Sequence, residues 1–299
     1  MLVEPEIEAM IGGPPRLRPE TIAAHPRMAE ARKVYLDRFL EVYGGDPFLV
    51  RLLIESGRFF VFHYTTILDA AHDPARRETW PTIGLLKRTM ARTGYASGRH
   101  IDHLVGRLCA VGYLEMRPAE QDRRVRLLRA TERLWAHDRD WLVAHYAPLD
   151  FLYPQHDYRR VMQCSPDFQV LLRGLSTRTY SLGAQIMPAM ADLNVVFFDR
   201  AGGFMVIAAV MQAAMESEDY PHASVPYADI GERFGVSRTH VRKVLVAAEE
   251  AGFVKLHARG GQRVEILPHL WSRYDYALAL GMFLHDILYV AATRVQSAT

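Results

Sequence analysis

Basic side chains recur at helical spacing in two stretches of this chain, and their chemistry fits a polyanion. Residues 97–131 hold seven Arg against four acids, and residues 237–267 hold six Lys or Arg against three acids. The two stretches together carry +6 in a chain whose net charge is +2, so the remainder carries −4. Positive charge gathered in this way is what the phosphates of a nucleic acid require. A solvated face of any protein also reaches +3, so the charge needs support from geometry.

The geometry comes from two predicted helices with the same pattern. The second helix runs from Ser237 to Ala251, because the Ser237 hydroxyl can accept from the first free backbone N–H groups and Gly252 can end the helix. Ser97 and Gly112 frame an equivalent helix 140 positions earlier. In both, five apolar residues share one face. They are Ile101, Leu104, Val105, Leu108 and Val111 in the first helix, and Val241, Val244, Leu245, Ala248 and Ala251 in the second.

The opposite faces of these helices are the candidate nucleic-acid contacts. A helix of this length fits the major groove of duplex DNA, and polar residues near its N-terminus reach the base edges. The same helices also occur as packing units in protein interfaces, so the pattern alone is not specific. The candidate residues are Ser97, Arg99, His100, His103 and Arg107, and then Ser237, Arg238, Thr239, His240, Arg242 and Lys243.

A β-hairpin is predicted after each helix. The first joins strands at 113–117 and 123–129 through residues 118–122, and the second joins 253–256 to 263–267 through a shorter basic tip. A hairpin beside a recognition helix can place Arg in the minor groove or on phosphates. The candidate hairpin residues are Arg123, Arg124, Arg126, Arg259 and Arg263.

Other chemistry has little support in the sequence. Thirteen histidines include no HxxxH pair with a carboxylate between, and His100 and His103 lie among outward basic residues, so no metal is expected. We find no phosphate-binding loop or nucleophile elbow, and expect neither an enzyme nor a cofactor. Cys109 is interpreted as a small buried apolar residue rather than a redox sensor. Two cysteines form no disulfide framework, which favours a reducing cytoplasm as the location of the protein. Within the cytoplasm, a DNA-binding protein is expected at the nucleoid.

The chain repeats itself beyond these helices. A shift of 140 positions aligns His25-Pro26 with Ser165-Pro166, and a shift of 136 aligns Leu134-Trp135 with Leu270-Trp271. A two-copy repeat of this length predicts a duplicated domain rather than a solenoid. The predicted organisation is a flexible N-terminal arm without helices at 1–25, a first winged-helix copy at 26–150 and a second at 151–299.

The predicted fold is mostly α with small β-hairpin wings: two tandem winged helix-turn-helix domains and long packing helices. The stretch Ala277–Ala292 is the nearest to a membrane span, but His285-Asp286 interrupts it, so it reads as a buried or interface helix. The long helices are expected at 27–43, 48–72 and 269–292, with helix starts at Asp46-Pro47 and Ser165-Pro166. Helix is also expected up to Leu193 and at 203–216, extended chain at 195–198, and the junction between copies at 147–165.

The stretch Ile83–Trp135 resembles the winged-helix core of the MarR family of bacterial transcription regulators. The resemblance is carried by Gly112-Tyr113-Leu114 and by the run Asp122–Thr131, which matches the Asp-x-Arg signature of that family's wing. It implies that Asp122 orients Arg124 for entry into the minor groove. The second copy lacks this Asp, and Arg259 or Arg263 are the substitutes. Members of the family are homodimers of single-copy chains, so the duplication resembles a fused dimer.

These expectations combine into a sequence-specific regulator that binds double-stranded DNA at an imperfect palindrome, as a monomeric pseudo-dimer or a homodimer, with no membrane partner. Two alternatives stay open: a plasmid-type replication initiator with tandem winged helices, and a winged-helix adaptor that contacts proteins. The resemblance also implies a small-molecule effector, although ordinary core is the favoured interpretation of the aromatic residues outside the reader helices. Those residues include Phe59, Phe60, Phe62, Tyr64, Phe197, Phe198 and Phe204.

Overall fold

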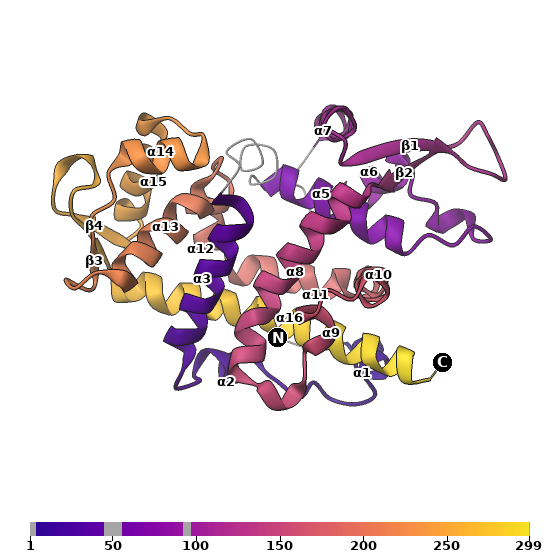
Figure 1. Ribbon diagram of the computed structural model, residues 1–299, viewed down its shortest axis with the longest axis horizontal. Coiled ribbons are helices and arrows are strands. Elements are labelled where there is room, and N and C mark those ends of the chain that lie inside the picture. Colours follow the sequence, from indigo (N-terminus) through magenta and orange to yellow (C-terminus); the bar gives the residue numbers. More distant parts are fainter. Residues whose placement is uncertain (1–3, 45–55, 92–96, 299) are drawn as a thin grey trace.

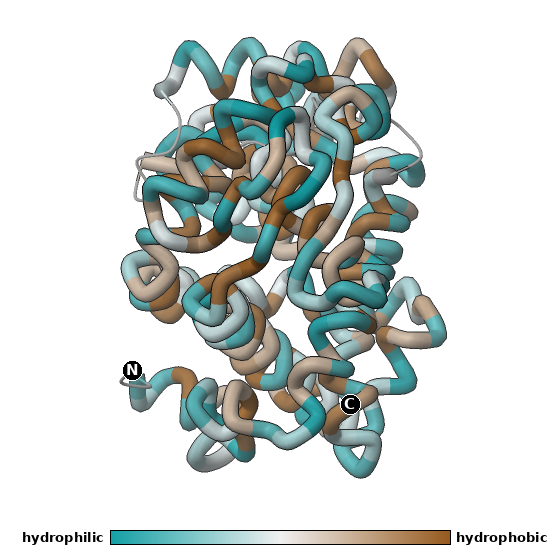
Figure 2. The backbone as a smooth tube through the Cα atoms, turned by 90° about the vertical axis from the view of Figure 1, so that its left-hand side faces the viewer, coloured by the Kyte–Doolittle hydropathy of each residue, from teal (hydrophilic) through white to brown (hydrophobic). Residues whose placement is uncertain are grey.

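The computed structural model describes residues 4–44, 56–91 and 97–298. The chain is mostly helical, with one two-stranded and one three-stranded antiparallel sheet (Figure 1). The expectation of a mostly α fold with small hairpins is therefore confirmed. Figure 2 shows hydrophobic and hydrophilic residues alternating along the helices, as expected of amphipathic helices that share one core.

The N-terminal segment is helical in part, so the expectation of an arm without helices is wrong. Helices α1 (Pro5–Ile11) and α2 (Pro19–Ala23) both pack against the C-terminal helix α16 (Pro268–Ser297). Ile7 and Ile22 are buried there. Between them the Arg16 guanidinium binds the Asp286 carboxylate, with Nη2 2.6 Å from Oδ1. Helices this short are unstable alone and depend on tertiary contacts, which local sequence patterns do not report.

The elements of the first copy follow the predicted order. The predicted helix 27–43 is observed within one residue at each end, whereas the predicted start at Asp46-Pro47 lies outside the described residues. The junction expected at 147–165 is partly wrong, because the last helix of this copy continues through Pro148 to Leu152. The elements are α3 (Met28–Gly44), α5 (Ser56–Ala70), α6 (Ile83–Ala91), α7 (Gly98–Ala110), β1 (Leu114–Pro118), β2 (Arg126–Ala130) and α8 (Glu132–Leu152).

The second copy departs from expectation before its helix–hairpin part. A 3-10 turn at Ser176–Thr179 divides the helix expected up to Leu193, and the chain expected to be extended at 195–198 forms a π-helical turn. This turn buries Val196 and Phe197 in the core, so burial overrides the strand preference of β-branched residues. The elements are α9 (Arg159–Met162), α10 (Pro166–Leu175), α11 (Tyr180–Ala189), α12 (Ala191–Leu193), α13 (Gly203–Glu216), β3 (His222–Ala223), α14 (Tyr227–Phe234), α15 (Arg238–Glu250), β4 (Val254–Leu256), β5 (Val264–Ile266) and α16.

The sequence repeat is also a repeat of backbone geometry. Helices α7 and α15 each have 13 residues and begin 140 positions apart, as do strands β1 and β4. After each hairpin the N–H of the next helix's N-cap residue donates to the residue before the first strand. The distances are 3.1 Å from Thr131 to the Tyr113 carbonyl and 3.0 Å from Leu267 to the Phe253 carbonyl. We call α6, α7, β1 and β2 the first unit, and β3, α14, α15, β4 and β5 the second unit.

The helices around the two units pack reciprocally. Helix α3 of the first copy contacts α13 of the second, and α10, which occupies the equivalent place in the second copy, contacts α5 of the first. Likewise α2 contacts α16, and α9, 140 positions after α2, contacts α8. The equivalent helices α8 and α16 contact each other. Contacts exchanged in this way are those of a two-fold dimer, here within one chain.

Buried ion pairs follow the same reciprocal rule. Arg32 on α3 lies 2.7 Å from Asp275 on α16, and Arg173 on α10 lies 2.5 Å from Asp138 on α8. Each pair joins α3, or its equivalent α10, of one copy to the last helix of the other. Removing one partner of such a pair would leave an uncompensated buried charge, so both pairs specify how the copies meet.

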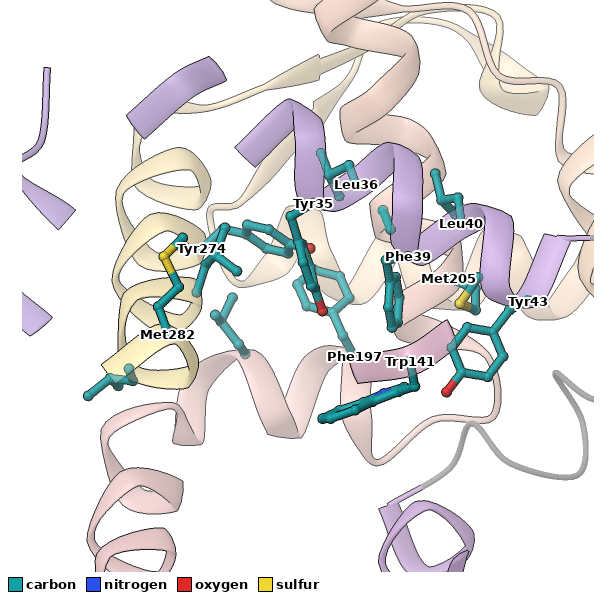
Figure 3. Packing of buried hydrophobic residues seen from close by; sticks show 14 of the residues in the cluster. Tyr35, Leu36, Phe39, Leu40, Tyr43, Trp141, Phe197, Met205, Tyr274 and Met282 are labelled. Atoms are coloured by element: carbon teal, nitrogen blue, oxygen red, sulfur yellow. The ribbon is translucent and has the colours of Figure 1, made fainter. Parts of the chain in front are cut away.

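The core lies between the copies. Tyr35, Phe39 and Tyr43 project from one side of α3 toward Trp141 and Tyr274, which belong to α8 and α16 (Figure 3). The two units lie on opposite sides of the central helices α3 and α8 (Figure 1). The shared core therefore fixes where the two units stand relative to each other.

Helix α16 is a buried helix, as its interrupted apolar pattern predicted. Among the described residues it is the one single helix long and apolar enough to cross a membrane, but 67% of its most apolar window is buried within the protein. The bent pair Pro166–Ala189 and Ala191–Phe198 passes the same test only when taken together. A core helix of a soluble protein has these properties too, and the fold is compatible with one.

Candidate nucleic-acid interface

The helix pair of the second unit is built around a tight glycine turn. Helix α14 ends at Gly235 in the left-handed conformation (φ 65°), and the Val236 N–H donates to the Gly231 carbonyl over 2.9 Å. A Cβ on Gly231 would lie 2.7 Å from the Val236 carbonyl oxygen, so only glycine allows this approach. The Ser237 Oγ then accepts from the His240 N–H at 3.1 Å and begins α15, as predicted.

The first unit has the same cap and the same buried face. The Ser97 Oγ accepts from the His100 N–H at 3.3 Å, and α6 precedes the cap across residues 92–96, which lie outside the described residues. The first four predicted apolar positions of both helices are buried. The fifth prediction is wrong in both, since Val111 is half-buried and Ala251 is exposed. The helices end one residue earlier, and these positions are caps.

The outward faces carry exposed cations. None of those on α7 or α15 has an ion-pair partner among the described residues, so their charge is available to a ligand. Ser97, Ser237 and Thr239 are exposed beside them. The exposed cations on the two helices are Arg99, Arg107, Arg238, Arg242 and Lys243, and His103 is exposed beside them.

Two histidines predicted to face outward do not. His240 is half-buried, and its Nε2 lies 2.7 Å from the Ala201 carbonyl oxygen, which anchors α15 to the turn before α13. His100 is also half-buried. Both follow the cap by three positions and lie on the boundary between the buried and exposed faces, so helical spacing alone misplaced them. His240 is therefore an anchor of the helix rather than a free contact.

The first hairpin holds Arg124 against Asp122. The N–H and Nε of Arg124 both donate to the Asp122 Oδ1 at 3.2 Å, while the Arg124 side chain is 92% exposed. Hydrogen bonds from Arg124 lower the pKa of Asp122, so the carboxylate stays ionised. Arg123 and Arg126 are exposed nearby. Asp122 thus holds the backbone N–H and the Nε of Arg124, and the rest of the Arg124 side chain projects into solvent.

The second hairpin is shorter and presents its cations differently. Strand β4 pairs with β5, and β3 pairs with the other edge of β5. The Arg263 Nη1 lies 2.5 Å from Asp219, so part of its charge is already neutralised. Arg259 is exposed and has no ion-pair partner among the described residues. Of the two substitutes considered for Arg124, Arg259 is the freer one.

The structure adds a basic residue that the sequence patterns missed. The Arg77 Nη2 lies 3.3 Å from the Asp122 Oδ2, and its guanidinium lies over the Trp80 ring at 5.3 Å. Trp80 itself is buried in a small separate core with Ala119 and Leu127 of the hairpin. The sequence signal was the Arg76-Arg77 pair just before Trp80-Pro81. Arg77 therefore extends the basic surface of the first hairpin.

A cavity lies between the copies, away from the basic surfaces. It measures about 760 Å³, and a neighbouring one about 240 Å³. Phe59, Phe60 and Trp141 line both. The favoured interpretation of the aromatic residues as ordinary core therefore holds only in part. Phe62 and Phe197 are buried in the core, but the others line the two cavities. The other predicted aromatic residues that line one of the cavities are Tyr64, Phe198 and Phe204.

Buried histidines surround Trp141 beside these cavities. The His145 ring stacks on the Trp141 ring with centroids 3.6 Å apart, and His285 lies 5.6 Å from both. Burial lowers the pKa of His63 and His145 well below the usual value and lowers the pKa of His285 to about 4. The Trp141 Nε1 has no hydrogen-bond partner among the described residues. The cavities are thus lined mostly by aromatic and apolar residues, with Asp199 in the larger one, and two buried donors, Trp141 Nε1 and Tyr274 Oη, have no hydrogen-bond partner among the described residues.

Comparison with known proteins adds no further assignment. No family model, no curated protein and no solved structure matches the chain.

Proposed function

We propose that this chain binds double-stranded DNA sequence-specifically and regulates transcription, using two winged helix-turn-helix readers in one polypeptide. The observation that carries the proposal is the repeated interface. Helices α7 and α15 have the same serine cap, the same four buried positions and outward cations without an ion-pair partner among the described residues, and each is followed by a basic hairpin. A helix for the major groove beside a hairpin for the minor groove or phosphates is a common way to read duplex DNA.

The reciprocal packing supports a fused dimer. In two-fold dimers of separate winged-helix chains, the interface sets the spacing of two recognition helices to about one turn of DNA, roughly 34–36 Å. Here α3, α8, α10 and α16 supply an equivalent interface within one chain. One chain then covers both halves of a site. Since the two hairpins differ in length and in their Arg contacts, the preferred site is an imperfect palindrome.

The Asp122–Arg124 contact supports the resemblance to MarR-like regulators. In that family the wing Asp orients an Arg toward the minor groove, and in this chain Asp122 accepts from both the backbone and the side chain of Arg124. A regulator of this kind acts at the bacterial nucleoid in the cytoplasm. The aromatic cavities suit a small apolar effector that accepts a hydrogen bond from Trp141 Nε1.

The experiment that tests the proposal is duplex binding as a function of salt. Lys and Arg that neutralise phosphates release counterions, so the logarithm of the binding constant falls steeply with the logarithm of salt, with a slope on the order of −5 for six phosphates. The adaptor alternative predicts a nearly flat dependence. A charge-neutral variant of α15, Arg242→Gln with Lys243→Gln, should reduce the slope, and a change of an exposed arginine on α9, Arg159→Gln, should not.

Genome-wide mapping of bound sites separates regulation from replication. Sites in many promoters support a transcription regulator. Sites confined to one origin with repeated elements support the replication initiator, which also uses tandem winged helices.

A further inference from the structure

Three side chains with metal-ligating atoms meet on one face of the sheet in the second unit. His222 on β3 and Glu265 on β5 are direct partners in the register of the two strands. His257 follows β4, and its N–H donates to the Arg263 carbonyl at 3.0 Å, which places it diagonally across from Glu265. Direct and diagonal neighbours on adjacent strands project from the same face. We call His222, His257 and Glu265 the triad.

The distances within the triad are close to those of a metal site. The His257 Nε2 lies 2.6 Å, and the His222 Nε2 3.9 Å, from the Glu265 Oε2. One donor atom from each residue lies within 4.8 Å of the other two, and no other group of three His, Cys, Asp or Glu in the described part of the chain meets this condition. The three side chains are 20–30% exposed, so an ion can reach them while the protein shields part of the site from water.

The hydrogen bonds around the triad suit a metal as well. The His222 Nδ1 lies 3.0 Å from the Asp219 carbonyl oxygen, to which it can only donate, and its Nε2 is the ring nitrogen that faces Glu265. A second partner of this kind is what fixes the tautomer of metal-binding histidines. The Asp219 side chain is held by Arg263 at 2.5 Å.

We propose that the triad binds one divalent transition-metal ion of the zinc class through two imidazole nitrogens and one carboxylate oxygen, with water completing the coordination. Two histidines and a glutamate form a recurrent ligand set for Zn²⁺, with bonds of roughly 2.0–2.2 Å. Binding replaces the hydrogen bond between His257 and Glu265: the proton leaves Nε2, and the ring binds as the neutral imidazole whose N–H is on Nδ1. The ligands come from β3, from β5 and from the residue after β4, and therefore no short sequence motif revealed them.

The ion joins all three strands at the base of the second hairpin. Strand β3 pairs with β5 through only two residue pairs, and the ion adds a bond that does not depend on the backbone ladder. The bound ion would then restrict movement of the strands that carry the hairpin tip with Arg259. The consequence for DNA rests on the proposed function: Zn²⁺ raises duplex affinity through the second unit. Metal binding itself is measured without DNA, so the two ideas fail separately.

The test titrates metal-free full-length protein with Zn²⁺ in competition with a chromophoric chelator, and repeats the titration with Co²⁺ to read its visible spectrum. We expect one ion per chain and a tetrahedral or five-coordinate Co²⁺ spectrum. His222→Gln, His257→Gln and Glu265→Gln should each weaken binding at least about tenfold, because even loss of an outer-shell partner costs roughly 10–100-fold. His269→Gln, an exposed histidine on α16, is the matched control and should not change binding.

Circular dichroism and melting of each variant in the metal-free state separate loss of a ligand from loss of the fold. Absence of binding in the folded wild-type protein overturns the proposal. So does binding that survives in Glu265→Gln and both histidine variants, because the ion is then held elsewhere. If binding follows the expected pattern but Zn²⁺ leaves duplex affinity unchanged, the site stands and its effect on DNA is wrong.

Discussion

Arg124 and Arg263 are equivalent in the predicted interface but differ in what holds them. Arg124 donates to Asp122 through its backbone and Nε and leaves its terminal nitrogens in solvent. Arg263 directs its Nη1 to Asp219, and its side chain is 46% exposed. Both contacts are ion pairs, but Arg124 makes its pair through Nε, so its terminal nitrogens do not have to leave Asp122 to bind DNA, whereas the Nη1 of Arg263 has to leave Asp219. We therefore expect the two hairpins to contribute unequally to DNA binding.

We expect Arg124→Ala to weaken binding to a specific duplex by about 1–3 kcal/mol, the range for an arginine that reads DNA directly. Arg263→Ala should reduce the binding free energy by less, because Arg263 is paired with Asp219 in the free protein and has to give up that pair to bind DNA. Fluorescence anisotropy at fixed salt measures both, with Arg159→Ala on α9 as the control. An equal or larger loss for Arg263→Ala would show that the resemblance misassigned the dominant arginine.

The two faces of α7 and α15 make separate predictions for folding and for binding. Leu104 and Leu245 are buried, so Leu104→Ala or Leu245→Ala should destabilise the fold by about 2–5 kcal/mol. His103→Ala and Lys243→Ala, on the exposed face, should leave thermal melts unchanged and alter duplex binding. The reverse pattern in melts and binding curves would mean that the register of these helices is wrong.

At the scale of elements, the two units differ in where glycine is required. Gly106 lies inside α7, and a Cβ added there would meet no atom within 4 Å, whereas Gly231 packs on the Val236 carbonyl oxygen. Gly106→Ala should stabilise the protein by about 0.5–1 kcal/mol, since Ala restricts the unfolded chain and favours helix.

Gly231→Ala should instead destabilise it by about 1–3 kcal/mol, as overpacking does. Chemical denaturation of the matched pair measures both effects. Equal destabilisation by the two changes would contradict the space that surrounds Gly106.

Local signals explain which elements the sequence predicted well. The serine caps at Ser97 and Ser237 and the glycines at Gly112 and Gly252 act within a few residues of each helix end, and both helices begin where predicted. The errors arise where distant contacts decide. His240 turns inward to a carbonyl 39 positions away, and α1 is helical because it packs on α16. The cavities depend on how both copies pack, which no local pattern contains.

At the scale of the whole molecule, the copies meet around a group of neutral, buried histidines. The pKa of His285 is about 4, below the value of roughly 6.5 in an unfolded chain, because burial disfavours its charged form. Between these pH values the unfolded state binds more protons than the folded state. Stability therefore falls as the pH drops from about 6.5 toward 4.

We expect urea denaturation to show this loss, at up to about 1.4 kcal/mol per pH unit for each such histidine. His285→Gln should reduce the slope of stability against pH, and His103→Gln, which changes an exposed histidine, should not. A stability that is flat between pH 7 and 5 would contradict the burial of these rings.

The reciprocal contacts of α3 with α13 and of α10 with α5 make the central claim a statement about stoichiometry. If the proposed function is correct, a two-fold arrangement within one polypeptide presents two readers to one duplex. The asymmetry of the hairpins leaves room for a further association of two chains, which would place four readers in one particle. The fused arrangement is incompatible with a requirement for two chains on one pair of half-sites.

The most direct measurement is the mass, by light scattering, of the complex formed on the shortest duplex that retains full affinity. The account predicts one chain per duplex, with both half-sites protected from cleavage. Alanine changes at Arg99 and Arg107 on α7 should remove protection of one half-site, and changes at Arg238 and Arg242 on α15 the other. A complex that always contains two chains for one pair of half-sites would contradict the fused pseudo-dimer, even if both units bind DNA.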